Sequence, residues 1–153
     1  MKQIFLVLFC CFSMNVFCQQ VSIKELLLLG KSNYDKFDSI AIAKGYRFQE
    51  VKSLGIDTFY SYAYGLEIST GRASNFLQYS KPLKGSYIAY ITLNSDEYLN
   101  LKNEAKKNGF SFLRESNVNG QPLIIYSKGN AQLQFITQTG DFGNKYFIRL
   151  RIL

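Results

Sequence analysis

The chain has 153 residues, 18 basic and 11 acidic side chains, a formal net charge of +7, three cysteines, and no histidine or tryptophan. Cys10, Cys11 and Cys18 all lie in the first 18 residues, and the chain has no histidine. Residues 19–153 therefore cannot form disulfides, thiolate or imidazole metal sites, cysteine nucleophiles or a Ser-His-Asp triad. The length predicts a single domain.

Residues 1–18 have the pattern of a signal peptide, with a basic start and an apolar run over residues 4–12. This run is too short for the roughly 20 residues that cross a bilayer, and no later stretch predicts a transmembrane segment. We therefore expect a mature chain of residues 19–153, with 17 basic and 11 acidic side chains, in the periplasm or secreted. A lipoprotein acylated at Cys18 is the alternative, although Phe17 is bulky where a small residue normally precedes such a cysteine.

The first half of the mature chain predicts two helices and four strands. Ser22 and Glu25 form a capping box ahead of Leu26–Leu29, and a second helix is expected over Tyr34–Ala43, ending at Gly45. Short β-prone runs bounded by turn residues then predict four strands: Tyr46–Val51, Thr58–Tyr64, Asn75–Ser80 and Ser86–Leu93.

The second half predicts one longer helix and four more strands. Asn94 and Glu97 form a second capping box, an apolar stripe follows at helical spacing, and Gly109 ends the helix. The stripe consists of Tyr98, Leu101 and Ala105. The expected strands are Phe110–Arg114, Leu123–Ser127, Gln132–Thr137 and Tyr146–Ile152. Asn119-Gly120 has the residues that a two-residue hairpin turn requires.

Three landmarks recur in the same order in the two halves, which indicates an internal repeat. They pair Lys44–Phe48 with Asn108–Phe112, Asn75–Tyr79 with Ala131–Phe135, and Gly85–Ile91 with Asn144–Leu150. We therefore predict an α+β fold of two tandem repeats, about residues 22–93 and 94–153. Each repeat has one or two helices followed by a four-stranded antiparallel sheet, with the helices on one face.

Alternation along the strands predicts which side chains face the helices. Two pairs of matched strands supply this core: Tyr87, Ala89, Ile91 and Leu93 with Tyr146, Ile148, Leu150 and Ile152, and Leu77 and Tyr79 with Leu133 and Phe135. In Thr58–Tyr64, either Phe59, Ser61 and Ala63 or the three alternating tyrosines face the helices. Outward tyrosines are favoured, because a buried hydroxyl without a partner costs about 1–3 kcal/mol.

The opposite face is then rich in tyrosine, glutamine and arginine. Its expected residues are Tyr60, Tyr62, Tyr64, Phe76, Gln78, Ile88, Tyr90, Tyr126, Gln132, Gln134, Phe147, Arg149 and Arg151. Tyrosine, arginine and apolar anchors are enriched at protein interfaces, so this face is a candidate for binding a protein. The alternative is a solvated sheet face, or one that a loop covers.

Three functions remain open. The first is an exported, cofactor-free module that binds an unidentified protein. The second is a binder of an anionic or carbohydrate polymer of the cell envelope. The third is a hydrolase working through two of Glu50, Asp57 and Glu67, since two carboxylates about 5–10 Å apart suffice for glycoside hydrolysis. No catalytic residue is assigned. No cofactor is expected. A metal site is not expected either, because the carboxylate pairs Asp96/Glu97 and Asp35/Asp38 lie at or in a helix, where carboxylates are ordinary. Nucleic acid is not expected as a partner, because the basic residues are scattered along the chain.

The tandem units of helix and four-stranded sheet resemble the architecture of the beta-lactamase inhibitor protein, and also that of small outer-membrane-assembly lipoproteins. The leader ending in Phe-Cys-Gln-Gln and the helix-Gly-aromatic repeats resemble exported proteins of Bacteroidota. The first resemblance implies an exported protein-binding fold. It carries over no binding residue, because it concerns architecture alone.

Overall fold

A computed structural model describes residues 20–55, 57–67, 69–70, 72–82, 85–140 and 143–153. The expected signal peptide lies outside these residues. In chain order the elements are α2 (Ile23–Gly30), α3 (Tyr34–Ala43), β1 (Arg47–Leu54), β2 (Asp57–Tyr64), β3 (Asn75–Ser80), β4 (Ser86–Thr92), α4 (Ser95–Lys107), β5 (Ser111–Val118), β6 (Gln121–Lys128), β7 (Ala131–Gly140) and β8 (Gly143–Ile152). Each expected helix and strand is present, with ends that differ by a few residues.

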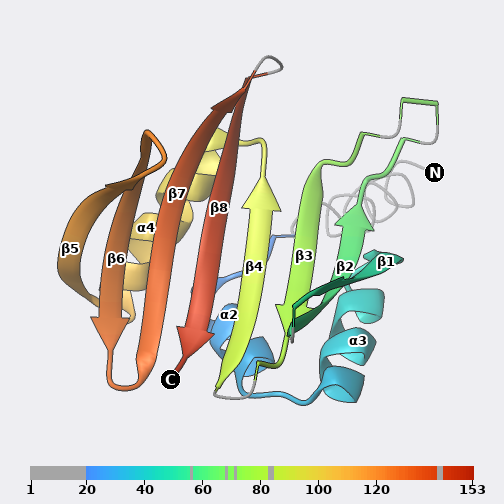
Figure 1. The fold of residues 1–153 in the computed structure, drawn as a ribbon, viewed down its shortest axis with the longest axis horizontal. Helices are drawn as coiled ribbons and strands as arrows, with labels where there is room; N and C mark the ends of the chain where they lie inside the picture. Colours follow the sequence, from blue (N-terminus) through green and yellow to red (C-terminus); the bar gives the residue numbers. More distant parts are fainter. Residues whose placement is uncertain (1–19, 56, 68, 71, 83–84, 141–142) are drawn as a thin grey trace, which may run out of the picture.

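The eight strands form one antiparallel sheet in the order β1-β2-β3-β4-β8-β7-β6-β5 (Figure 1). The α+β class with an antiparallel sheet is therefore confirmed. The sheet is larger than the expected four-stranded layout, because β4 pairs with β8 along Ser86–Thr92 and joins the two halves.

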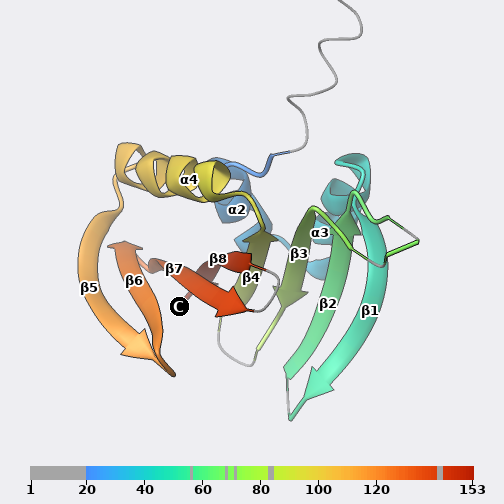
Figure 2. The ribbon, with the colours of Figure 1, turned by 90° about the horizontal axis from the view of Figure 1, so that it is seen from above.

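Helices α2, α3 and α4 lie on one side of this sheet, and the outer strands extend further from the helices than the central ones do (Figure 2). The other face, which we call the helix-free face, is therefore concave. Helix α2 lies across the junction of β4 and β8. Its last residue, Gly30, is packed so closely that an added Cβ would come within 2.7 Å of Leu150 Cδ2.

The helix ends follow the sequence signals, with one correction. Ser22 and Glu25 form the expected reciprocal capping box of α2. The Asn94 side chain caps α4 by accepting from the backbone N–H groups of Asp96 and Glu97. The Glu97 side chain does not return to Asn94, however. It turns toward the sheet, and the backbone N–H of Asn94 instead donates to Thr92 Oγ1.

The expected faces of β3, β7 and β8 are confirmed. Leu77 and Tyr79 of β3, Leu133 and Phe135 of β7, and Ile148 and Leu150 of β8 are all buried in one core with the helices. This core also contains Leu26 and Leu29 of α2, Phe37 of α3 and Leu101 of α4.

The expected faces of β4 are wrong. Ile88, Tyr90 and Thr92 face the helices, and Tyr87, Ala89 and Ile91 lie on the helix-free face; Leu93 follows the strand and is exposed. The repeat alignment matched Tyr90 with Arg149. In the sheet, Leu77 lies opposite Tyr90 as Leu133 lies opposite Leu150, so the position in β8 that corresponds to Tyr90 is Leu150, one residue further along. A slip of one residue exchanges the two faces of a strand.

The expected outward position of the tyrosines of β2 and β6 is also wrong. Tyr60, Tyr62 and Tyr64 face the helices, and Tyr126 of β6 is buried against Phe135. Helix α3 supplies hydrogen-bond partners for the buried Tyr62 hydroxyl, which the sequence pattern did not indicate. Tyr62 donates to Asp38, and its hydroxyl lies 3.1 Å from that of Tyr34. Burial raises the pKa of Tyr62, so its hydroxyl stays protonated as a donor.

Candidate functional site

The helix-free face retains seven of the residues expected to bind a partner. They are Phe76 and Gln78 of β3, Gln132 and Gln134 of β7, and Phe147, Arg149 and Arg151 of β8. The remaining six, Tyr60, Tyr62, Tyr64, Ile88, Tyr90 and Tyr126, belong to the helix-covered face and form part of the core or pack against it. The predicted surface is thus divided between the two faces of the sheet.

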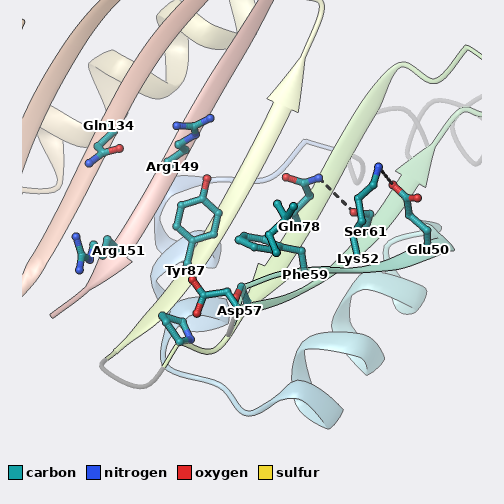
Figure 3. Close-up of a pocket in the computed structure, with 13 residues that line it drawn as sticks. Glu50, Lys52, Asp57, Phe59, Ser61, Gln78, Tyr87, Gln134, Arg149 and Arg151 are labelled. Atoms are coloured by element: carbon teal, nitrogen blue, oxygen red, sulfur yellow. Dashed lines mark hydrogen bonds and ion pairs between the residues drawn. The ribbon is translucent and has the colours of Figure 1, made fainter. Parts of the chain in front are cut away.

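A cleft of about 610 Å³ lies on the helix-free face (Figure 3). Its lining residues are Glu50, Lys52, Leu54, Asp57, Phe59, Ser61, Gln78, Ser80, Pro82, Tyr87, Gln134, Arg149 and Arg151. Sequence reasoning missed most of those from β1, β2 and β4. The correct faces of β2 and β4 would have revealed Phe59, Ser61 and Tyr87 by alternation alone.

Small side chains make room for the cleft. Ser61, Ser80 and Ala89 are buried small residues of the neighbouring strands β2, β3 and β4, and all three lie on this face. A second cavity of about 350 Å³ lies on the side of β5, β6 and β7, and it shares Gln134 and Arg149 with the cleft. These two residues therefore stand at the centre of a hollow that extends over both halves of the sheet.

The side chains of the face form ordered rows across the sheet. Antiparallel pairing places Ala63, Phe76, Ile91, Phe147, Ile136 and Leu123 side by side on successive strands from β2 to β6. We call this row the apolar band. The next row, Ser61, Gln78, Ala89, Arg149 and Gln134, places one cation between two amides. We call it the polar row. An apolar strip and a polar strip therefore run in parallel along the hollow.

Three buried polar atoms in the cleft have no hydrogen-bond partner among the described residues. They are Arg149 Nε, Asp57 Oδ1 and Ser80 Oγ. Buried polar atoms are normally paired, and an unpaired one costs about 1–3 kcal/mol. Other polar groups of the cleft are engaged: Gln78 Nε2 donates to Ser61 Oγ at 3.2 Å, and Lys52 Nζ lies 3.5 Å from Glu50 Oε1. The floor of the cleft thus contains buried polar atoms whose hydrogen bonds the described residues leave unmade.

Arg149 is the central charge of the face. Its guanidinium carbon lies 5.4 Å from the ring centroid of Phe147, close enough for a cation–π contact. The Tyr87 hydroxyl points toward Arg149 in Figure 3. Burial raises the pKa of Tyr87, and the positive charge of Arg149 acts in the opposite direction. The guanidinium thus lies near the Phe147 ring, and its Nε has no partner among the described residues.

The carboxylates proposed for hydrolysis separate into two groups. Glu50 and Asp57 both line the cleft. Glu67 lies elsewhere, in an isolated bridge with Arg72, and accepts from Thr70 Oγ1 at 2.8 Å. Within the described ranges, no three acidic residues gather in a way that could hold a metal ion.

A second polar cluster lies on the helix-covered face around Glu97. Its Oε1 accepts from Tyr90 at 2.5 Å, and its Oε2 accepts from Thr92 at 2.6 Å and Asn75 at 3.1 Å. Burial raises the pKa of Tyr90, which keeps its hydroxyl a donor. Both carboxylate oxygens are engaged, so Glu97 anchors the first turn of α4 to β3 and β4 rather than facing a ligand.

Comparisons of the chain with protein-family models, with curated proteins and with solved structures found no match. No helix in the described part of the chain is both long and apolar enough to cross a membrane. Function is therefore inferred from the chemistry of the helix-free face itself.

Proposed function

We propose that this protein is a cofactor-free binding module that holds another protein on its concave helix-free face. The observation that carries the proposal is the hollow itself. Its floor combines half-buried aromatic side chains with an arginine whose buried Nε has no partner among the described residues. Aromatic residues and arginine are enriched at the centres of protein interfaces.

The shape of the face favours a protruding segment of a partner over a flat surface. The outer strands rise on both sides of the hollow (Figure 2). Phe76 and Phe147 lie on either side of Ile91 in the apolar band. They are half-buried before any partner binds, which limits the side-chain entropy that binding would cost.

Export to the periplasm or the outside, and descent of the two halves from one repeated unit, form part of the same proposal. Two correspondences support the repeat. Each edge strand has a register shift after its second residue, between Phe48 and Glu50 and between Phe112 and Arg114. The ring of Phe48 meets Tyr62 edge-on, as that of Phe112 meets Tyr126. The likeness to the beta-lactamase inhibitor protein likewise remains a proposal about architecture.

The test removes two aromatic side chains from the apolar band. Wild type and the double variant Phe76→Ala/Phe147→Ala serve as baits for proteins of the compartment to which the chain is exported. Truncating an interface anchor costs about 2 kcal/mol or more, so the partner captured by wild type should bind the variant at least about 30-fold more weakly. Titration of the identified partner measures the loss.

The matched control is Leu28→Ala/Leu99→Ala. It also removes two apolar side chains, but from exposed positions of α2 and α4 on the helix side. Partner binding should be unchanged in this variant, and thermal melting should show that both variants are folded. Equal losses in the two variants, or none in either, would refute the proposal.

Salt dependence distinguishes the polymer alternative. Contacts between scattered cations and a polyanion weaken steeply with salt, whereas an aromatic protein interface does not. Binding to the captured protein that survives 0.5 M salt would support the module. A tight complex with an anionic polysaccharide that dissociates in the same salt would favour the alternative.

A further inference from the structure

The two halves of the helix-free face differ in charge. Strands β5 to β8 place four cations on this face: Arg114, Lys145, Arg149 and Arg151. Among the described residues, the same four strands place no carboxylate there, since Glu115 pairs with Ile124 and lies on the other side. The β1 and β2 side is balanced, with Arg47 and Lys52 beside Glu50 and Asp57. The positive half therefore complements an acidic partner.

We propose, building on the proposed function, that the occupant is an amphipathic acidic segment of the partner protein. Its apolar side chains lie on the apolar band, and one aspartate or glutamate meets Arg149 in the polar row. Two neighbouring rows on one face of a sheet are roughly 7 Å apart, because side chains repeat every second residue along each strand. Neighbouring side chains of one segment reach both rows at this spacing.

The geometry of the polar row suits a carboxylate. Arg149 lies between Ala89 and Gln134, and Gln78 lies beyond Ala89 on the next strand. The small Ala89 side chain lies opposite Arg149 on the neighbouring strand, and Arg149 lines both the cleft and the second cavity. A carboxylate accepts charge-assisted hydrogen bonds from a guanidinium, and the amide of Gln134 is placed to bond the backbone of the same segment.

The length of the apolar band sets the size of the segment. The band runs over six strands, from β2 to β6, in the observed order of the sheet. Strands are about 4.8 Å apart, so the band is roughly 24 Å long. An extended chain covers this distance in about seven residues. Such a segment needs apolar side chains that contact the apolar band. A polyanion without apolar side chains would contact only the cations of the face.

The test uses capped ten-residue synthetic peptides. The first alternates leucine and glutamate, the second alternates leucine and glutamine, and the third is polyglutamate; dextran sulfate serves as a polymer probe. Binding to the exported protein is followed by NMR shifts of backbone amides and by titration. The leucine–glutamate peptide should shift amides of β3, β4, β7 and β8, and bind at least about tenfold more tightly than the other two peptides.

Variants of the protein then test whether Arg149 is the cation that binds the glutamate side chain of the peptide. Arg149→Gln should weaken binding of the leucine–glutamate peptide at least about tenfold. Arg149→Lys keeps the positive charge but not the paired N–H donors of the guanidinium, and it should weaken binding less. Lys36→Gln removes one exposed charge from α3 on the helix side and should leave binding unchanged. Melting temperatures of all three variants establish that they are folded.

The outcomes separate this inference from the proposed function. Equal binding of the glutamate and glutamine peptides, or no effect of Arg149→Gln, overturns the acidic segment while Phe76→Ala/Phe147→Ala still tests the module. Absence of peptide binding overturns it too. Polyglutamate or dextran sulfate binding as tightly as the leucine–glutamate peptide would instead show a polyanion surface and refute both.

Discussion

Gly45 and Gly109 end α3 and α4 in the same left-handed conformation, with φ of +83° and +82°. At each end the glycine N–H donates to the carbonyl three residues earlier, and the next N–H donates to the carbonyl five residues earlier. This is the Schellman arrangement, which satisfies the last carbonyls of a helix. The aromatic residues that follow, Tyr46 and Phe110, are thereby directed into the core.

Valine at either glycine should destabilise the protein by more than about 1 kcal/mol, because a β-branched residue resists positive φ. Gly45→Val should cost more than Gly109→Val. A Cβ at residue 45 would lie 3.3 Å from the Tyr64 ring, whereas at residue 109 its nearest neighbour is Lys128 Nζ at 3.7 Å. Urea unfolding measures both. Lys107→Val, at the last residue of α4, is the control and should cost only some tenths of a kcal/mol, from the lower helix propensity of valine.

Tyr90 and Tyr87 provide a matched pair of tyrosines on opposite faces of β4. Tyr90→Phe deletes the hydroxyl that donates to buried Glu97 and should cost about 1–3 kcal/mol. Tyr87→Phe makes the same chemical change on the helix-free face and should stay within about 0.5 kcal/mol. Chemical denaturation of both variants tests this, and equal costs would contradict the observed faces of β4.

At the scale of elements, a charged link joins α2 to the end of α3. Lys44 Nζ lies 2.7 Å from Glu25 Oε1, and the other Glu25 oxygen accepts from Ser22. Burial raises the pKa of Glu25, but the bonds from Lys44 and Ser22 outweigh it, and the net effect is a pKa below 4.5. The link therefore stabilises the folded state fully above pH 4.5 and is lost as pH falls through the lowered pKa.

Glu25→Gln should accordingly destabilise the protein at pH 7, by about 0.2–1 kcal/mol for a partly exposed pair. The difference from wild type should shrink as pH falls through the lowered pKa of Glu25, because the carboxylate of the wild type then becomes protonated. Urea unfolding over a series of pH values from 7 downward follows the difference. Lys44→Gln should show the same trend, and a cost that persists unchanged to the lowest pH at which the protein stays folded would mean that packing rather than charge holds the two helices.

Elements with strong local signals were predictable. Helix ends were predictable from their capping residues and from the glycines that follow. The hairpin turn at Asn119-Gly120 was predictable from its residue types, and both residues have positive φ, as such a turn requires. The edge strands β1 and β5 extend three and four residues beyond their expected ends, to Leu54 and Val118. All of their residues are exposed, the apolar ones included. The alternation of polar and apolar side chains that marks a half-buried strand is therefore missing.

At the scale of the whole molecule, the candidate site was predictable only in strands whose own residue pattern identifies the buried face. Leu77 and Tyr79 of β3, and Leu133 and Phe135 of β7, alternate with polar residues, so their faces were clear. Both faces of β4 carry large side chains, Tyr87 and Ile91 on one and Ile88 and Tyr90 on the other, so only its pairing with β8 decides between them. That pairing joins distant parts of the chain. Sequence alone thus located the β3, β7 and β8 side of the cleft, together with the carboxylates Glu50 and Asp57, and missed the other residues of β1, β2 and β4.

The pairing of β4 with β8 also constrains the order in which the protein can fold. Most neighbouring strands are consecutive hairpins, but β4 pairs with β8 from Thr92↔Tyr146, 54 positions apart, to Ser86↔Ile152, 66 positions apart. Closing such a loop costs more entropy than closing a hairpin. Helix α2 packs on both strands, with Gly30 against Leu150, so its apolar side is fully buried only once β8 has paired with β4. Until then Leu26 and Leu29 lack this cover, and transiently exposed apolar surface favours aggregation.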